Sequence, residues 1–167
     1  MAIFIALLRA VNVGGTGTLP MTDLKSLCEG LGLTDVRTYI QSGNVVFDSA
    51  WAEAHTKAML ETALLAKMGK PIDVMVRSAT EMAAILKRNP FPSVQGSKVS
   101  VWFFDKTPNK ALFATIAIPD REEIRLAGRE VYVHYPDGMG RSKLKLIFNS
   151  CRAGRGFKSL ILQGTTV

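Results

Sequence analysis

The sequence predicts an α+β protein made of two ferredoxin-like halves, each of the β-α-β-β-α-β type, that pack together as one unit. Three observations predict this fold. The first 78 residues alternate strand-like and helix-like patterns in that order, and the order β-α-β-β recurs after residue 98. A chain of 167 residues also has room for two small halves that share a core.

The first half is expected at residues 1–78. Its elements are, in order, a strand at 2–8, a helix at 21–31, hairpin strands at 36–40 and 45–48, a helix at 51–66 and a strand at 72–76. The turn QSGN joins the hairpin strands, and Gly69 followed by Pro71 ends the second helix. The residues expected to form the buried face of that helix are Trp51, His55, Ala58, Met59, Thr62, Leu65 and Ala66.

The second half is expected at residues 79–167 and begins with a linking helix. Ser78 and Glu81 have the spacing of a capping box, which predicts a helix from about 79 to 88 that ends at the stretch NPFP. The further predicted elements are a strand at 99–104, a helix capped by Thr107-Pro108 that carries Leu112, Phe113 and Ile116, and hairpin strands at 124–126 and 131–135. Residues 142–148 are interpreted as a short helix or strand, and the rest of the basic C-terminal tail as largely irregular.

The positive charge is concentrated at the end of the chain. The net charge is +7, but residues 1–80 carry seven basic and seven acidic residues and are neutral. After Asp137 there is no acid, and the basic residues are Arg141, Lys143, Lys145, Arg152, Arg155 and Lys158. Such a block attracts polyanions, or serves only as a solvated basic tail.

Glycines and polar residues cluster after the first strand and in the hairpin turn. In a β-α-β-β-α-β unit these two places lie at the same edge of the sheet. The predicted ligand-binding residues are Arg9, Asn12, Gly14, Gly15, Tyr39, Gln41, Ser42 and Asn44. Glycine backbone N–H groups and an arginine fork suit an anion, although the same residues also occur in ordinary turns.

A second cluster follows the last predicted hairpin, in the stretch YPDGMGRSKLK at 135–145. Glycines free the chain here, so that a secondary basic site for an anion is predicted from Arg141, Ser142, Lys143 and Lys145. The alternative is a tight turn that leads into a basic helix.

The sequence indicates no catalytic set and no metal site. It has no Ser/His/Asp arrangement, no paired catalytic carboxylates and no Cys/His spacing of the kind that binds metals, so no cofactor is expected. The apolar run at 2–8 is shorter than a membrane span and no basic region precedes it. A cytoplasmic protein without membrane contact is therefore expected.

These observations favour an anion-binding module that recognises a nucleotide or a nucleic acid. Two alternatives stay open. One is an enzyme that acts on a small phosphorylated or carboxylated metabolite, with Arg9 orienting the substrate and Tyr39 or Asp48 transferring a proton. The other is a structural or partner-binding domain, and the oligomeric state is open for all three.

Several motifs resemble a known family. They are ALLRAVNVGG at 6–15, PMTDLKSL at 20–27, DVRTYIQSGNVVFDS at 35–49, NPFP at 89–92 and VYVHYPDGMGRSKL at 131–144. Together they are similar to the domain-of-unknown-function 1697 family, DUF1697. The resemblance extends to about Leu144 and implies two ferredoxin-like α+β subdomains, with no assigned biochemical role.

Two places depart from the pattern of that family. Ala10 and Val11 stand where Gly and Ile are usual, and residues 151–167 read CRAGRGFKSLILQGTTV where the family has a segment resembling ARNWNTVxKL. No role of the family's closing segment is therefore carried over to this chain.

Overall fold

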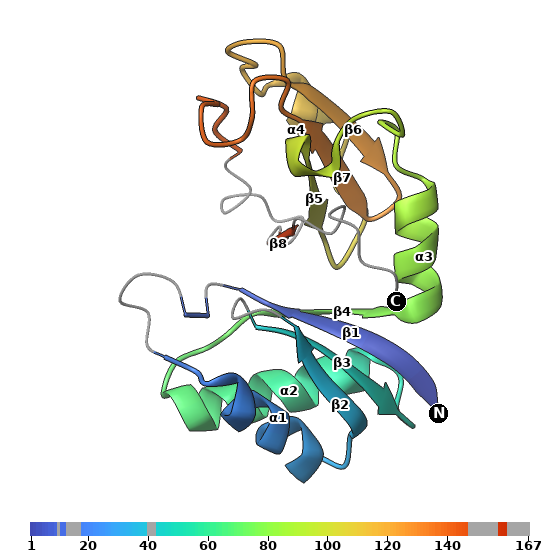
Figure 1. The fold of residues 1–167 in the computed structure, drawn as a ribbon, viewed down its shortest axis with the longest axis vertical. Helices are drawn as coiled ribbons and strands as arrows, with labels where there is room; N and C mark the ends of the chain where they lie inside the picture. The colour runs from blue at the N-terminus through green and yellow to red at the C-terminus, as the bar shows by residue number, and fades with distance from the viewer. Residues whose placement is uncertain (10, 13–17, 40–42, 147–156, 160–167) are drawn as a thin grey trace. The chain divides into compact units, whose positions relative to one another are not determined.

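The computed structural model describes residues 1–9, 11–12, 18–39, 43–146 and 157–159 (Figure 1). Helices accompany two four-stranded sheets in which all neighbouring strands are antiparallel, and this confirms the α+β class. The chain divides into two compact units, Met1–Ala84 and Ile85–Val167.

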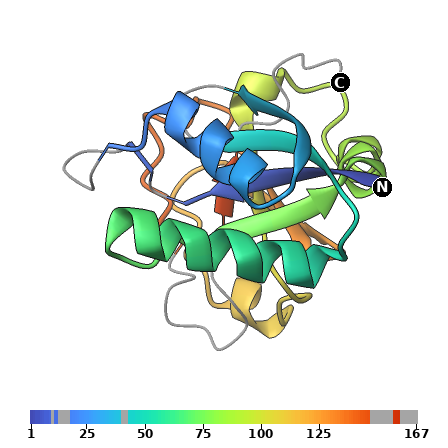
Figure 2. The same cartoon turned by 90° about the horizontal axis from the view of Figure 1, so that it is seen from below.

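The first unit has the element order that the sequence predicts. Its elements are β1 (Ala2–Leu8), α1 (Met21–Gly30), β2 (Thr34–Tyr39), β3 (Asn44–Ser49), α2 (Glu53–Met68) and β4 (Val74–Ser78). The strands lie in the order β2-β3-β1-β4. Both helices cover the same face of this sheet, as Figures 1 and 2 show.

The core of the first unit lies between the sheet and these two helices. Phe4, Ala6 and Leu8 point into it from β1, because alternate residues of a strand face the same side. Leu24 and Leu60 contribute from α1 and α2 and are fully buried. Such burial of apolar side chains supplies most of the stability of a small unit.

The predicted buried face of α2 is wrong. The structure buries Thr56, Leu60 and Leu64, whereas Trp51 and Leu65 are exposed. Apolar residues occur all around this helix, so the sequence spacing fits more than one face. The Thr56 hydroxyl lies 3.2 Å from the hydroxyl of Ser49 at the end of β3, and this hydrogen bond lets a polar residue be buried.

An arginine is buried on the other face of the same sheet. Arg77 of β4 is 0% exposed; its Nη1 donates to the carbonyl of Val76 at 2.9 Å and lies 3.6 Å from Oε1 of Glu53. Its neighbours on this face, Ile5 and Met75, are also buried. Around Arg77 the face of the sheet opposite the helices is therefore buried as well.

The capping box at the start of the linking helix is confirmed. Helix α3 (Ala79–Lys87) begins directly after β4, and the backbone N–H of Ser78 donates to the Glu81 carboxylate at 3.1 Å. The backbone N–H of Glu81 donates in return to the Ser78 hydroxyl at 3.2 Å. Two otherwise unpaired backbone donors are thus satisfied.

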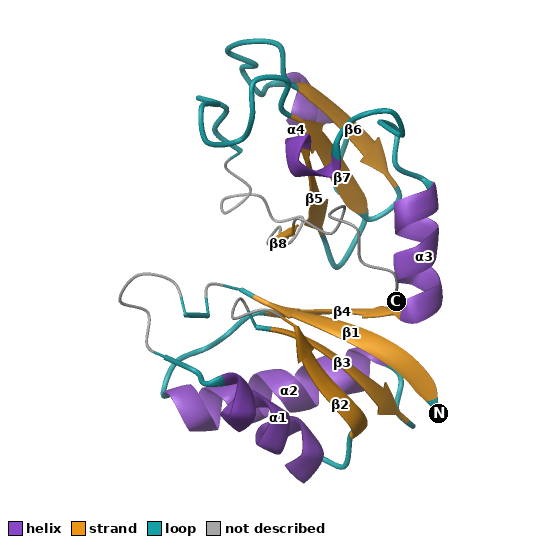
Figure 3. Cartoon of the chain, viewed as in Figure 1, coloured by secondary structure: helices purple, strands orange, loops and turns teal. Residues whose placement is uncertain are grey.

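The second unit contains a smaller amount of helix. Its elements beyond α3 are η1 (Gly96–Lys98), β5 (Val99–Phe103), α4 (Ala111–Ala114), β6 (Glu123–Ala127), β7 (Glu130–His134) and β8 (Phe157–Ser159), with strand order β6-β7-β5-β8 (Figure 3). The predicted β6–β7 hairpin is confirmed, with Gly128 at a φ of 68° in its turn. A left-handed residue of this kind suits a two-residue hairpin turn.

Three predictions for the second unit are wrong. Helix α4 has only four residues and does not extend from Thr107 to Ile116, because β-branched residues and Pro119 follow it. Residues 142–146 form neither helix nor strand. The tail, which is expected to be irregular, contributes β8. This strand pairs with β5, which lies far away in the sequence, so no local pattern indicates the pairing.

Candidate functional site

The structure brings the exit of β1 next to the β2–β3 hairpin, as the topology predicts. The Leu8 N–H donates to the Gly43 carbonyl at 3.3 Å. Gly43 has a φ of 84°, and a Cβ at this position would lie 3.1 Å from Cβ of Leu8. Glycine is required here both by the backbone conformation and by the close approach of the two chain segments.

Two of the predicted ligand-binding residues face each other across the hairpin. The strand register pairs Tyr39 with Asn44, Asn44 with Leu7, and Leu7 with Met75. These four residues form one row across the sheet, on the face opposite the helices, because paired residues of antiparallel strands point to the same side. Tyr39 is 50% exposed, and Asn44 is half-buried.

Arg9 follows β1 directly and reaches the same end of the sheet. Its N–H donates to the carbonyl of Asp73 at 3.0 Å, and its Nη1 lies 3.8 Å from Oδ2 of Asp73. The two side chains are 32% and 29% exposed, so solvent screens the pair and its contribution to stability is small. Asp73 offsets part of the positive charge that an anion would meet at Arg9.

Asn12 has a structural role in this region. Its Nδ2 donates to the carbonyl of Leu19 at 2.9 Å, and its Oδ1 accepts from the N–H of Leu19 at 2.7 Å. With a φ of 59°, Asn12 adopts the left-handed conformation that asparagine tolerates better than most residues. The predicted residues Gly14, Gly15, Gln41 and Ser42 lie outside the described residues.

The secondary basic site is a row of three exposed cations, Arg141, Lys143 and Lys145, which we call the basic row. The residues between and after them, Ser142, Leu144 and Leu146, are half-buried. The two leucines pack against the hydrophobic cluster of the second unit. In the part of the chain that the structure describes, no acid pairs with any member of the basic row.

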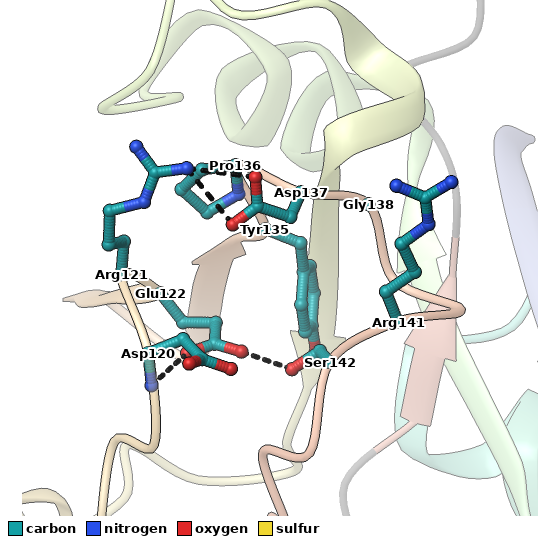
Figure 4. Close-up of a pocket in the computed structure, with 9 residues that line it drawn as sticks. All are labelled: Asp120, Arg121, Glu122, Tyr135, Pro136, Asp137, Gly138, Arg141 and Ser142. Carbon is teal, nitrogen blue, oxygen red and sulfur yellow. Dashed lines mark hydrogen bonds and ion pairs between the residues drawn. The ribbon is translucent and has the colours of Figure 1, made fainter.

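A pocket of about 220 Å³, part of it open to solvent, lies beside the basic row (Figure 4). It is lined by Asp120, Arg121, Glu122, Tyr135, Pro136, Asp137, Gly138, Arg141 and Ser142. Arg121 holds Asp137 through two hydrogen bonds of 2.8 and 3.1 Å. The cavity proper is about 20 Å³, room for a water molecule and far below the range of about 300–1,000 Å³ typical of small-molecule sites.

Glu122 attaches the start of the basic row to this pocket. Its carboxylate is buried, 6% exposed, and accepts a hydrogen bond from the Ser142 hydroxyl and another from the N–H of Asp120 at 3.1 Å. The Ser142 hydroxyl in turn accepts from the N–H of Leu144 at 3.1 Å. The hydrogen bond from Ser142 lowers the pKa of Glu122, because it stabilises the charged form.

Sequence reasoning did not single out Glu122 or Tyr135. Tyr135 is 4% exposed, and burial raises its pKa, with the polar groups of Ser100 and Trp102 partly opposing that shift. Glu122 and Ser142 are 20 residues apart, so no local motif indicates their contact. Only the fold of the second unit brings them together.

Among the described residues, no group of three or more His, Cys, Asp or Glu side chains is arranged to hold a metal ion. No helix within the described ranges combines the length and apolar character needed to cross a membrane. Cys28 is buried in the first unit, and this burial raises the pKa of its thiol to about 12.

A comparison with known protein families shows to which family the chain belongs. The sequence pattern of the family described as "Protein of unknown function (DUF1697)" matches residues 1–132. The chain belongs to this family. The predicted DUF1697 membership is thereby confirmed, and the match ends within β7, before the basic row.

A solved structure has a similar fold. The conserved bacterial protein SP0830 from Streptococcus pneumoniae is 22% identical, with a TM-score of 0.69 over 81% of this chain and 78% of that protein. At this level of identity the likeness shows the fold alone. No curated protein matches the chain.

Proposed function

We propose that this DUF1697 protein binds nucleic acid through the phosphate backbone, with the basic row as the contact surface. The observation that supports this proposal is the set of three exposed cations, Arg141, Lys143 and Lys145, that have no acidic partner among the described residues. Unpaired cations on a surface attract polyanions and release counterions on binding.

The attachment of the basic row supports the same proposal. Leu144 and Leu146 pack on the hydrophobic cluster, and Ser142 is held by the buried carboxylate of Glu122. The segment is therefore fixed to the second unit although it has no helix or strand. A fixed row loses less conformational entropy on binding than a free tail would.

A salt-dependent titration tests the proposal. The full chain is titrated into fluorescently labelled single-stranded and duplex DNA and RNA at several salt concentrations. Each phosphate contact contributes a slope of about −0.7 to −0.9 in log K against log salt, so three contacts give a slope of about −2 to −3. Absence of binding even at low salt would overturn the proposal.

A charge-matched pair of variants locates the contact. The triple change Arg141→Gln, Lys143→Gln and Lys145→Gln removes the basic row, and we expect it to abolish most of the salt slope. The control is the triple change Lys87→Gln, Lys106→Gln and Lys110→Gln, which removes the same charge from other exposed positions of the second unit. If both variants weaken binding equally, net charge is responsible and the basic row is not the site.

A further inference from the structure

We propose a second binding site, on the first unit, for a nucleoside monophosphate whose base stacks on Tyr39 and whose phosphate contacts Arg9. The site lies at the end of the sheet where β1 and the β2–β3 hairpin meet. It uses none of the residues of the basic row, so its existence does not depend on the proposed nucleic-acid contact.

Tyr39 supplies the stacking surface. It is the last residue of β2, a strand at the edge of the sheet, and half of its surface is exposed. The other aromatic residues of this sheet, Phe4 and Phe47, are buried on the opposite face in the hydrophobic core. An exposed tyrosine ring on a sheet face stacks a nucleobase of any kind.

Asn44 supplies hydrogen bonds to the base. It stands directly opposite Tyr39, and the Cβ atoms of such cross-strand pairs are about 4.5–5.5 Å apart. Asn44 is half-buried, and neither its side-chain amide nor the Tyr39 hydroxyl has a hydrogen-bond partner among the described residues. A carboxamide offers a donor and an acceptor side by side, which matches the edge of a nucleobase.

Arg9 supplies the contact to phosphate. It lies two strands across and two residues along from Tyr39, a Cα separation of about 12 Å, which the arginine side chain and a base linked through ribose to a phosphate can span together. The Asp73 carboxylate, 3.8 Å away, holds the guanidinium at this end of the sheet. A guanidinium has five donors, so it can bind a carboxylate and a phosphate oxygen together.

The positions of these groups identify the class of ligand. An inorganic anion would contact Arg9 alone, and a nucleoside would contact Tyr39 and Asn44 alone. A nucleoside monophosphate contacts both ends of the site. It can be a free nucleotide or one residue of a nucleic-acid strand, and the two sources share this chemistry.

Calorimetric titration of the full chain at low salt tests the site. The probes are the four nucleoside monophosphates, with adenosine and inorganic phosphate as partial ligands. We expect AMP to bind at least tenfold more tightly than adenosine or phosphate. If none of the four monophosphates binds, the site is excluded.

Variants assign the contacts. Tyr39→Ala should weaken AMP binding at least tenfold, because stacking on an aromatic ring is lost, whereas Tyr39→Phe should retain it. Arg9→Gln should weaken AMP at least tenfold and leave adenosine unchanged. AMP binding that is unaffected by Tyr39→Ala would overturn the proposal.

Two controls separate this site from other contacts. Trp51→Ala removes the other exposed aromatic of the first unit, near the opposite end of β3, and should leave AMP binding unchanged. The triple variant of the basic row should also bind AMP like the wild type; a loss in either control would refute the assignment.

A 5′-phosphorylated trinucleotide that binds tenfold more tightly than AMP would identify a strand as the source, and equal affinity would identify the free nucleotide.

Discussion

The basic residues of the first unit differ from the basic row of the second unit in how they are paired. Six of the seven in the first unit form ion pairs, with N···O distances of 2.7–3.9 Å: Arg9–Asp73, Lys25–Glu29, Arg37–Asp35, Lys57–Glu61, Lys67–Asp23 and Arg77–Glu53. The basic row of the second unit has no acidic partner among the described residues. The cations of the first unit are therefore mostly compensated by local acids, whereas the basic row contributes an uncompensated field.

This comparison teaches that net charge alone does not locate a binding surface. A paired cation on a surface contributes little to stability and little to the long-range field, although it can still contact a ligand directly, as proposed for Arg9. An exposed cation without an acidic partner makes no ion pair that stabilises the fold. Its substitution should therefore leave the free energy of unfolding nearly unchanged. Substitutions that distinguish the two kinds of cation are the direct test of this difference.

The largest effect is expected for the buried cation of the first unit. Arg77→Met should lower the free energy of unfolding by about 3 kcal/mol, because it removes the bonds to Val76 and Glu53 that this fully buried guanidinium makes. Urea denaturation monitored by circular dichroism measures the change. Arg37→Met is the matched control, since its pair with Asp35 is exposed and should contribute less than about 0.5 kcal/mol. Equal losses in the two variants would contradict the structural role of Arg77.

The next effect concerns the group that holds the basic row. Glu122→Gln should lower the free energy of unfolding by about 1 kcal/mol at pH 7, because hydrogen bonds to a charged acceptor are stronger than those to a neutral one.

The pH dependence gives this prediction its sign. The pKa of Glu122 is lowered in the folded state from its ordinary value of 4.5. Its stabilising contribution is therefore present above that value and is lost as the pH falls through the lower, folded-state pKa. Denaturation at pH 7 and at decreasing acidic pH should show a smaller acid-induced loss for Glu122→Gln than for the wild type. The same acid dependence in both proteins would show that this carboxylate is not responsible.

Much of the fold could be predicted because its signals are local. The helical and strand periodicities, the capping box of Ser78 and Glu81 and the hairpin turn at Gly43 each depend on residues close in sequence. The approach of Arg9, Tyr39 and Asn44 also follows from topology, because a β-α-β-β-α-β order brings the end of the first strand to the hairpin. The shared core of the two halves stays a prediction.

The remaining features depend on contacts between distant residues. The stretch VMVRS indicates a strand but not that Arg77 is buried, since an arginine is ordinarily taken to be exposed. The buried face of α2 includes Thr56, whose hydroxyl is satisfied by Ser49 of β3, and apolar periodicity does not indicate this contact. The contact of Glu122 with Ser142 and the pairing of β8 with β5 require the complete second unit.

A smaller effect is expected for the half-exposed cation of the first unit. Arg9→Ala should lower the free energy of unfolding by less than about 1 kcal/mol, because a solvent-screened pair at 3.8 Å contributes little. Chemical denaturation of this variant and of the wild type measures it. A loss of about 3 kcal/mol or more would make Arg9 a structural residue and would remove the reason to place a phosphate beside it.

The smallest effect is expected in the basic row. The double change Lys143→Gln and Lys145→Gln should alter the free energy of unfolding by no more than about 0.5 kcal/mol. Both side chains are exposed, and their substitution breaks no ion pair among the described residues. The half-buried Leu144 between them should continue to pack against the hydrophobic cluster, so the segment keeps its place on the second unit. The same variant should lower the affinity for nucleic acid and reduce the salt slope by about two phosphate contacts. A substantial loss of stability would mean that these lysines support the fold, and the basic row would then resemble the paired cations of the first unit.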